Sequence, residues 1–155
     1  MSLVSLRYLL SFSLYVFAYF SFSGSGIWTY SLVFYVYLFI PFLELVSKPN
    51  YLNIAPEEID VIQNQKIYDY IIFLVVPFQY FFLFYFLQSY SIELTLTEKI
   101  GKIVSMGALC AHAINVAHDL GHRHNKFAQF LSKTLLLSTL NTHFFIEHNR
   151  GHHKR

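Results

Sequence analysis

The sequence predicts an all-α fold, a polytopic membrane helix bundle. Hydrophobic residues make up 55% and charged residues only 13% of the 155 residues, whereas soluble domains average about 25% charged residues. Long apolar runs recur between short polar segments, and a run of about 20 residues crosses a hydrocarbon core of about 30 Å. We therefore expect a single membrane domain over residues 1–155, with about four transmembrane helices and a re-entrant or interfacial helical segment.

The first two predicted spans form a helical hairpin. Residues 3–22 are apolar and aromatic, with one charge, Arg7, near the start. A cleaved signal peptide is the rival interpretation, because the Ser-Gly-Ser-Gly stretch at 23–26 could contain a cleavage site. The apolar run is longer than the usual 7–15-residue core of such a peptide, which favours a membrane helix. Residues 27–46 form the second span, and Pro41 should kink it because proline lacks a backbone N–H.

Two further spans follow a polar loop over residues 47–69. Residues 70–90 are dense in phenylalanine and tyrosine and contain Pro77. After a polar link at 91–99, residues 100–124 form a fourth helix. Its glycine, alanine and serine residues would let neighbouring helices approach closely. We therefore expect this helix to lie inside the bundle.

The last apolar segment, residues 127–146, has the length of a fifth span. A straight helix of about 20 residues rises about 30 Å, which would separate His148 from His122 by the whole membrane. If both belong to one site, the segment must return to the same side as a re-entrant hairpin or an interfacial helix. Tilted spans, or histidines deep within the bundle, are the alternative.

The charges predict the orientation of the chain in the membrane. With a cytoplasmic N-terminus, two of the 11 lysines and arginines, Lys99 and Lys102, lie outside and the others inside, as the positive-inside rule expects. Residues after His118 would then face the cytoplasm. The net charge of +2, spread along the chain, argues against a nucleic-acid partner. The single cysteine, Cys110, can form no internal disulfide and no thiolate cluster.

Five of the eight histidines lie in two short groups near the end of the sequence: His118, His122, His148, His152 and His153. Imidazole is the commonest protein ligand for transition metals, and side chains spaced i, i+4 on a helix project from the same face. A histidine-rich, oxygen-poor set favours Fe, Cu or Zn over Mg or Ca. Five imidazoles exceed the three ligands of a catalytic zinc site. They favour two metals, or one metal with an incomplete second set.

Three neighbouring residues are candidate supports for these ligands. Asp119 and Glu147 flank the two groups, and each can accept the second ring N–H of a ligand histidine. Asn115 lies one turn before His118 and is a further candidate, although packing explains it equally well. The remaining histidines have no i, i+4 relation to either group, so we expect hydrogen-bonded or solvated roles for them: His112, His124 and His143.

Both histidine groups resemble motifs of one family. Residues 114–123 resemble its first box, His-Glu-(Leu/Met)-x-His-Lys, and residues 143–153 its second, Glu-His-x-x-Gly-His-His. The family is that of the integral-membrane alkane 1-monooxygenases of the AlkB type, relatives of membrane fatty-acid desaturases and xylene monooxygenases. The sequence departs from the first box at two positions: Asp119 replaces the usual glutamate, and Arg123 replaces the usual lysine.

The resemblance implies that the five histidines are ligands of a di-iron centre holding two non-haem iron ions. Such an enzyme hydroxylates the terminal methyl group of an alkane with O2, and receives electrons from rubredoxin and rubredoxin reductase. It also implies a bacterial inner membrane protein surrounded by lipid, with both boxes facing the cytoplasm. Because the family has further histidine boxes downstream, we expect this sequence to be an N-terminal portion that is inactive alone. No residue is assigned as catalytic.

Three other interpretations stay open from the sequence. A related fatty-acid desaturase or xylene monooxygenase would share the boxes. An intramembrane zinc metalloprotease would use His118-Asp119-x-x-His122 in place of His-Glu-x-x-His, but this leaves the second group unexplained. The third interpretation is a non-catalytic membrane fragment.

Overall fold

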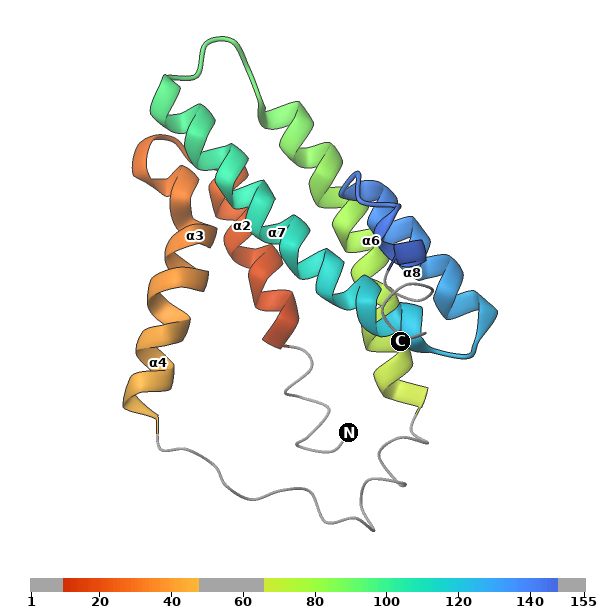
Figure 1. The fold of residues 1–155 in the computed structure, drawn as a ribbon. Helices are drawn as coiled ribbons and strands as arrows, with labels where there is room; N and C mark the ends of the chain where they lie inside the picture. Colours follow the sequence, from red (N-terminus) through yellow and green to blue (C-terminus); the bar gives the residue numbers. More distant parts are fainter. Residues whose placement is uncertain (1–9, 48–65, 148–155) are drawn as a thin grey trace.

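The computed structural model describes residues 10–47 and 66–147, which fold into helices with no strand among them (Figure 1). Three helical segments are long and apolar enough to cross a membrane, and a shorter apolar one precedes them: Gly26–Val46, Ile67–Ser89, Leu96–His122 and, shorter, Leu10–Ser23. The predicted all-α membrane helix bundle is confirmed. The predicted first span, 3–22, begins in residues outside the described part.

The first hairpin is built from short helical pieces joined end to end. They are η1 (Leu10–Phe12), α2 (Ser13–Ser23), η2 (Gly26–Tyr30), α3 (Ser31–Phe34), η3 (Tyr35–Phe39) and α4 (Ile40–Val46). The segment η3 is a π-helix that directly precedes Pro41. A proline interrupts the hydrogen bonds of an α-helix, and the wider π turn accommodates that interruption. The second span thus continues through its proline.

The next two helices begin earlier than the sequence predicted. They are α6 (Lys66–Ser89) and α7 (Leu96–His122). A capping box starts α7: Thr95 Oγ1 accepts the N–H of Glu98 at 3.3 Å, and Glu98 Oε2 accepts the N–H of Thr95 at 2.9 Å. Because both exchange hydrogen bonds with N–H groups at the helix start, residues 96–99 of the predicted polar link belong to the helix. At its other end α7 stops at His122.

The segment predicted as one helix over 127–146 consists of two, α8 (Lys126–Ser138) and α9 (Phe144–Ile146). A Schellman motif ends α8: the N–H of Asn141 donates to Leu136 O at 2.9 Å, and the N–H of Leu140 donates to Leu137 O at 3.1 Å. With 13 residues, α8 rises about 20 Å, too little to cross a core of about 30 Å. The chain then turns back toward α7.

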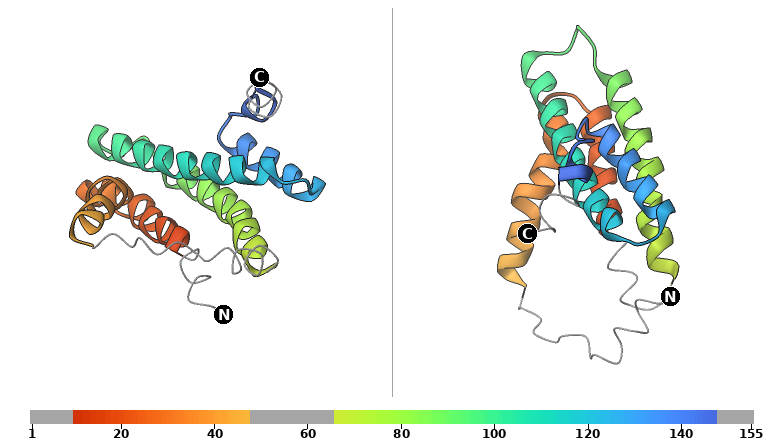
Figure 2. Two further views of the ribbon diagram at one scale, coloured as in Figure 1. Left: turned by 60° about the horizontal axis from the view of Figure 1, so that its bottom comes forward. Right: turned by 45° about the vertical axis from the view of Figure 1, so that its right-hand side comes forward.

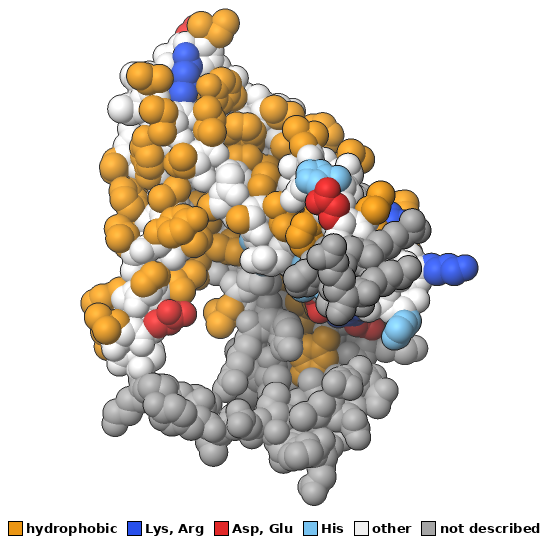
Figure 3. Space-filling model, in the orientation of Figure 1, with side chains coloured by type: hydrophobic (Ala, Val, Ile, Leu, Met, Phe, Trp, Pro, Cys, Tyr) orange, Lys and Arg blue, Asp and Glu red, His pale blue; other side chains and the backbone are white. Residues whose placement is uncertain are grey.

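The helix α7 lies at the centre of the bundle (Figures 1 and 2). Its N-terminal half packs against α2, η2 and α3, and its C-terminal half against α6 and α8. Fully buried core side chains come from several of these helices, among them Tyr15, Phe22, Leu109 and Leu136. Many large apolar side chains are exposed instead, and they cover much of the face in Figure 3. A bilayer would cover such a surface.

Candidate metal centre

The structure brings His118 and His122 together at the C-terminal end of α7. Their Nε2 atoms lie 3.0 Å apart, and their rings are nearly perpendicular, at 82° with centroids 4.4 Å apart. At this distance one ring N–H can donate a hydrogen bond to the other ring nitrogen. Two imidazole nitrogens bound at right angles to one metal, each about 2.1 Å from it, would also lie about 3.0 Å apart. The pair therefore fits two neighbouring ligands of a single metal ion.

The helices α8 and α9 hold the turn of α7 that carries this pair. Ser132 Oγ donates to Ala117 O at 2.6 Å, directly before His118. After the reversal that follows α8, the Phe144 ring lies against His118, with centroids 6.1 Å apart. Gly121 is buried at the same contact. The first histidine box is therefore in contact with the residues that lead into the second.

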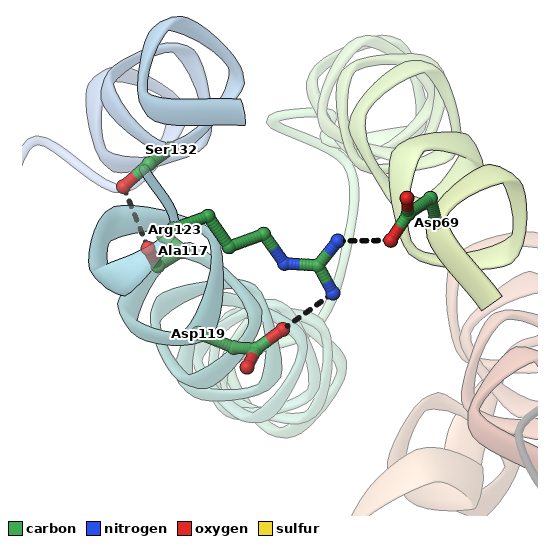
Figure 4. A network of polar contacts seen from close by, with 5 residues as sticks. All are labelled: Asp69, Ala117, Asp119, Arg123 and Ser132. Atoms are coloured by element: carbon green, nitrogen blue, oxygen red, sulfur yellow. Dashed lines mark hydrogen bonds and ion pairs between the residues drawn. The ribbon is translucent and has the colours of Figure 1, made fainter. Parts of the chain in front are cut away.

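Arg123 closes the end of α7 with a network of polar contacts (Figure 4). Its Nη1 pairs with Asp69 Oδ1 on α6, and its Nη2 pairs with Asp119 Oδ2 on α7 at 3.2 Å. The Arg123 backbone carbonyl accepts a hydrogen bond from Gln129 Nε2 on α8 at 2.9 Å. One residue thus connects α6, α7 and α8 at the end of the helix that carries the histidine pair.

The predicted supporting residues have varied surroundings. Asp119 pairs with Arg123 through one carboxylate oxygen. Asn115 borders a cavity of about 360 Å³ between α6 and α7, together with His112 and Asp119. Glu147 is exposed. Their roles beside a ligand histidine stay predictions.

The predicted ligands His148, His152 and His153 lie outside the described residues. Within residues 10–47 and 66–147, no group of three or more His, Cys, Asp or Glu side chains is arranged to hold a metal. The described part of the predicted centre is therefore one pair of ligands.

The three other histidines are not alike. His124 and His143 are exposed, as solvated side chains would be. His112 packs edge-on against Tyr15, with centroids 6.2 Å apart, and its buried Nε2 has no hydrogen-bond partner among the described residues. The expectation of a hydrogen-bonded or solvated role does not describe that atom.

Three residues near the end of α7 were not predicted from the sequence: Asp69, Ser132 and Phe144. For Asp69 a signal was present, because it is a carboxylate at the edge of an apolar span on the same predicted membrane side as Arg123. For Ser132 and Phe144 the sequence held no such signal. Their contacts depend on the reversal after α8, which brings together residues distant along the chain.

The fold and this site define a class: a polytopic membrane protein with a candidate histidine metal site at the end of one span. No protein-family model matches the chain. It is 33% identical over 123 residues to the alkane 1-monooxygenase of Acinetobacter baylyi. The aligned residues are 77% of this chain and 30% of that protein. It is 31% identical over 134 residues to that of Ectopseudomonas oleovorans, covering 85% and 33% of the two. The alkane 1-monooxygenase 1 of Alcanivorax borkumensis is 29% identical over 134 residues, with the same coverage.

The chain belongs to the alkane 1-monooxygenase family. It spans about a third of the length of the curated relatives it matches. The resemblance of its two histidine boxes to this family is thereby supported by similarity over most of the chain.

Proposed function

We propose that this chain carries the first ligands of the di-iron centre of an alkane hydroxylase. His118 and His122 would bind one metal through Nε2, and His148, His152 and His153 would supply further ligands. The observation that carries the proposal is the Nε2–Nε2 separation of 3.0 Å, which suits two ligands of one ion. The contact between Phe144 and His118 supports a shared site, because Phe144 lies just before Glu147 and the second box.

The overall reaction we propose is alkane + O2 + 2 electrons + 2 protons giving a primary alcohol and water. Bound iron would supply the oxidising power that an unactivated C–H bond requires. His118 and His122 would hold that iron through Nε2, and the Phe144 ring covers one side of His118. The apolar bundle would give an alkane a route from the bilayer.

The electrons would come from rubredoxin, reduced by an NAD(P)H-dependent rubredoxin reductase. We place the protein in a bacterial inner membrane with the histidine boxes on the cytoplasmic side. The distribution of lysine and arginine supports this orientation, since only Lys99 and Lys102 would lie outside. A reduced cytoplasmic donor could then reach the site directly.

Family membership favours hydroxylation of an alkane over desaturation of a fatty acid. The zinc protease hypothesis needs Asp119 as a general base beside metal-bound water. The Asp119 carboxylate instead pairs with Arg123 at 3.2 Å, so this geometry does not support that role.

Metal analysis of the purified 155-residue chain tests the ligand assignment. After loading with ferrous iron in detergent, the chain should retain stoichiometric iron, and His118→Ala or His122→Ala should lower the retained iron at least tenfold. His124→Ala is the matched control, because His124 is exposed and two residues from His122. Equal iron in all four proteins would contradict the assignment.

A chimera tests the reaction itself. This chain would replace the matching third of the Acinetobacter baylyi relative, and the product would be reconstituted with rubredoxin, its reductase and NADH. We expect conversion of octane to 1-octanol, lost in the His118→Ala chimera. A chimera that binds iron but gives a desaturated product, or no octanol, would contradict alkane hydroxylation.

A further inference from the structure

Arg123 is the first residue after the helix that carries the histidine pair, and its guanidinium lies between two carboxylates. One belongs to Asp69 on the neighbouring helix α6, the other to Asp119 one turn back on α7 (Figure 4). The two contacts differ in consequence. The Asp119 contact stays within one helix, whereas the Asp69 contact fixes the end of α7 relative to α6.

We propose that Arg123 and Asp69 are positioning residues that hold the last turn of α7 so that the His118 and His122 nitrogens converge. The proposal rests on the proposed metal site. Neither residue binds the metal in this arrangement. Their effect on metal binding passes through the geometry of the histidine pair.

The position of the network at a helix end is the first argument. The last turn of a helix frays easily, because its final carbonyls lack partners within the helix. His122 is the last residue of α7, so its distance from His118 depends on that turn staying helical. Gln129 and Ser132 hold the turn from the α8 side. From the α6 side, Asp69 pairs with Arg123.

The chemistry of arginine is the second argument. Its planar guanidinium offers separate nitrogens in a fixed fork, so Nη1 and Nη2 can engage two carboxylates at once. Lysine offers a single ammonium nitrogen on a flexible stem and cannot keep both contacts in the same geometry. Arg123→Lys, which restores the residue usual in the family's first box, would therefore keep at most one of these two contacts.

The exposure of the network separates positioning from general stabilisation. The Arg123 side chain is 27% exposed and that of Asp69 48%, and ion pairs this exposed contribute little to global stability. If the two residues had a purely structural role, substituting them would lower the metal affinity and the melting temperature together. A positioning role lowers metal affinity while the melting temperature stays nearly constant.

Cobalt binding by the full chain tests the proposal, because the visible spectrum of bound Co²⁺ reports its ligand geometry. We expect Asp69→Asn and Arg123→Gln to weaken cobalt binding about tenfold, as changes to groups that orient metal ligands do, and to alter the spectrum. The melting temperature should change little. The charge-swapped double variant Asp69→Arg/Arg123→Asp should restore part of the affinity.

Hydrogen–deuterium exchange of the metal-free chain gives a second readout. Asp69→Asn should speed exchange in peptides covering residues 118–123 and leave those from the N-terminal half of α7 unchanged. If Asp69→Asn has the same cobalt affinity, cobalt spectrum and hydrogen exchange as the wild type, the positioning proposal is overturned, while the proposed metal site is not. If the wild-type chain binds no cobalt, the proposed metal site is contradicted. If hydrogen exchange is also unchanged in Asp69→Asn, the positioning role is overturned as well.

Discussion

The two ends of α7 use their polar side chains in opposite ways. At the N-terminal end, Lys102 and Ser105 are buried, and each donates to backbone carbonyls of other segments. At the C-terminal end, His122 and Asp119 are exposed, and the two box histidines face one another. The same helix therefore closes the bundle at one end and presents the candidate metal ligands at the other.

The polar contacts at the closed end join α7 to the neighbouring helices. Lys102 Nζ donates to Phe22 O at 2.8 Å and to Ser89 O at 2.9 Å, at the C-terminal ends of α2 and α6. Ser105 Oγ donates to Thr29 O at 2.9 Å. These donors satisfy carbonyls that helix ends leave unpaired. At the other end of α7 the polar pairs lie among exposed or half-buried side chains, such as Arg123 with Asp69 and Asp119.

Lys102→Met gives the largest effect expected from this comparison. The substitution keeps an apolar stem and removes a charged donor shared by two carbonyls, and hydrogen bonds to charged groups are worth about 1.5–3 kcal/mol. We expect the free energy of unfolding to fall by about 3 kcal/mol, measured by SDS titration in mixed micelles with circular dichroism. Lys99→Met is the control, because Lys99 lies on the same helix, is partly exposed, and donates to one carbonyl, Ile92 O. Equal losses in both variants would remove the distinction between the two kinds of lysine.

Gly101→Ala tests how closely α7 packs at the closed end. A Cβ on Gly101 would lie 2.8 Å from Thr29 Cβ and 2.8 Å from Tyr30 Cε2, so the first hairpin would have to move. Overpacking of this kind costs about 1–3 kcal/mol, and we expect a loss of about 2 kcal/mol in the same titration. Gly107→Ala is the matched control, since nothing lies within 4 Å of its Cβ position. Higher helix propensity should stabilise that variant by up to about 1 kcal/mol. A neutral Gly101→Ala would show that this contact is loose.

The sequence was informative where the determinants are local. Apolar runs locate the spans, and the i, i+4 spacing correctly places His118 and His122 on one face of a helix. The start of α7 was missed although Thr95 and Glu98 form a recognisable capping pair, so that error was avoidable. The end of α8 was not predictable in the same way, because Leu140 stands where glycine usually marks a Schellman motif. The contacts of Asp69 and Phe144 with the site depend on the packing of whole helices, which no local pattern encodes.

Leu140→Gly gives the smallest expected effect and tests whether the side of the histidine pair also carries backbone strain. Among the described residues, Leu140 is the non-glycine residue with positive φ, at 57°. Left-handed backbone costs a residue with a side chain about 1–2 kcal/mol, and glycine adopts it freely. The Leu140 side chain is 88% exposed, so little packing is lost, and we expect a gain of about 1 kcal/mol in the free energy of unfolding.

The control for this prediction is Leu137→Gly, three residues earlier on α8, where the side chain is 57% exposed but the backbone is helical. Glycine within a helix should lower the free energy of unfolding by about 1 kcal/mol, so the two variants should change stability in opposite directions. A loss in Leu140→Gly as well would mean that the exposed leucine contributes more than its strained backbone costs. A gain would show that the turn returning the chain to His118 is held under strain, whereas Lys102 and Ser105 close the other end of α7 with paired hydrogen bonds.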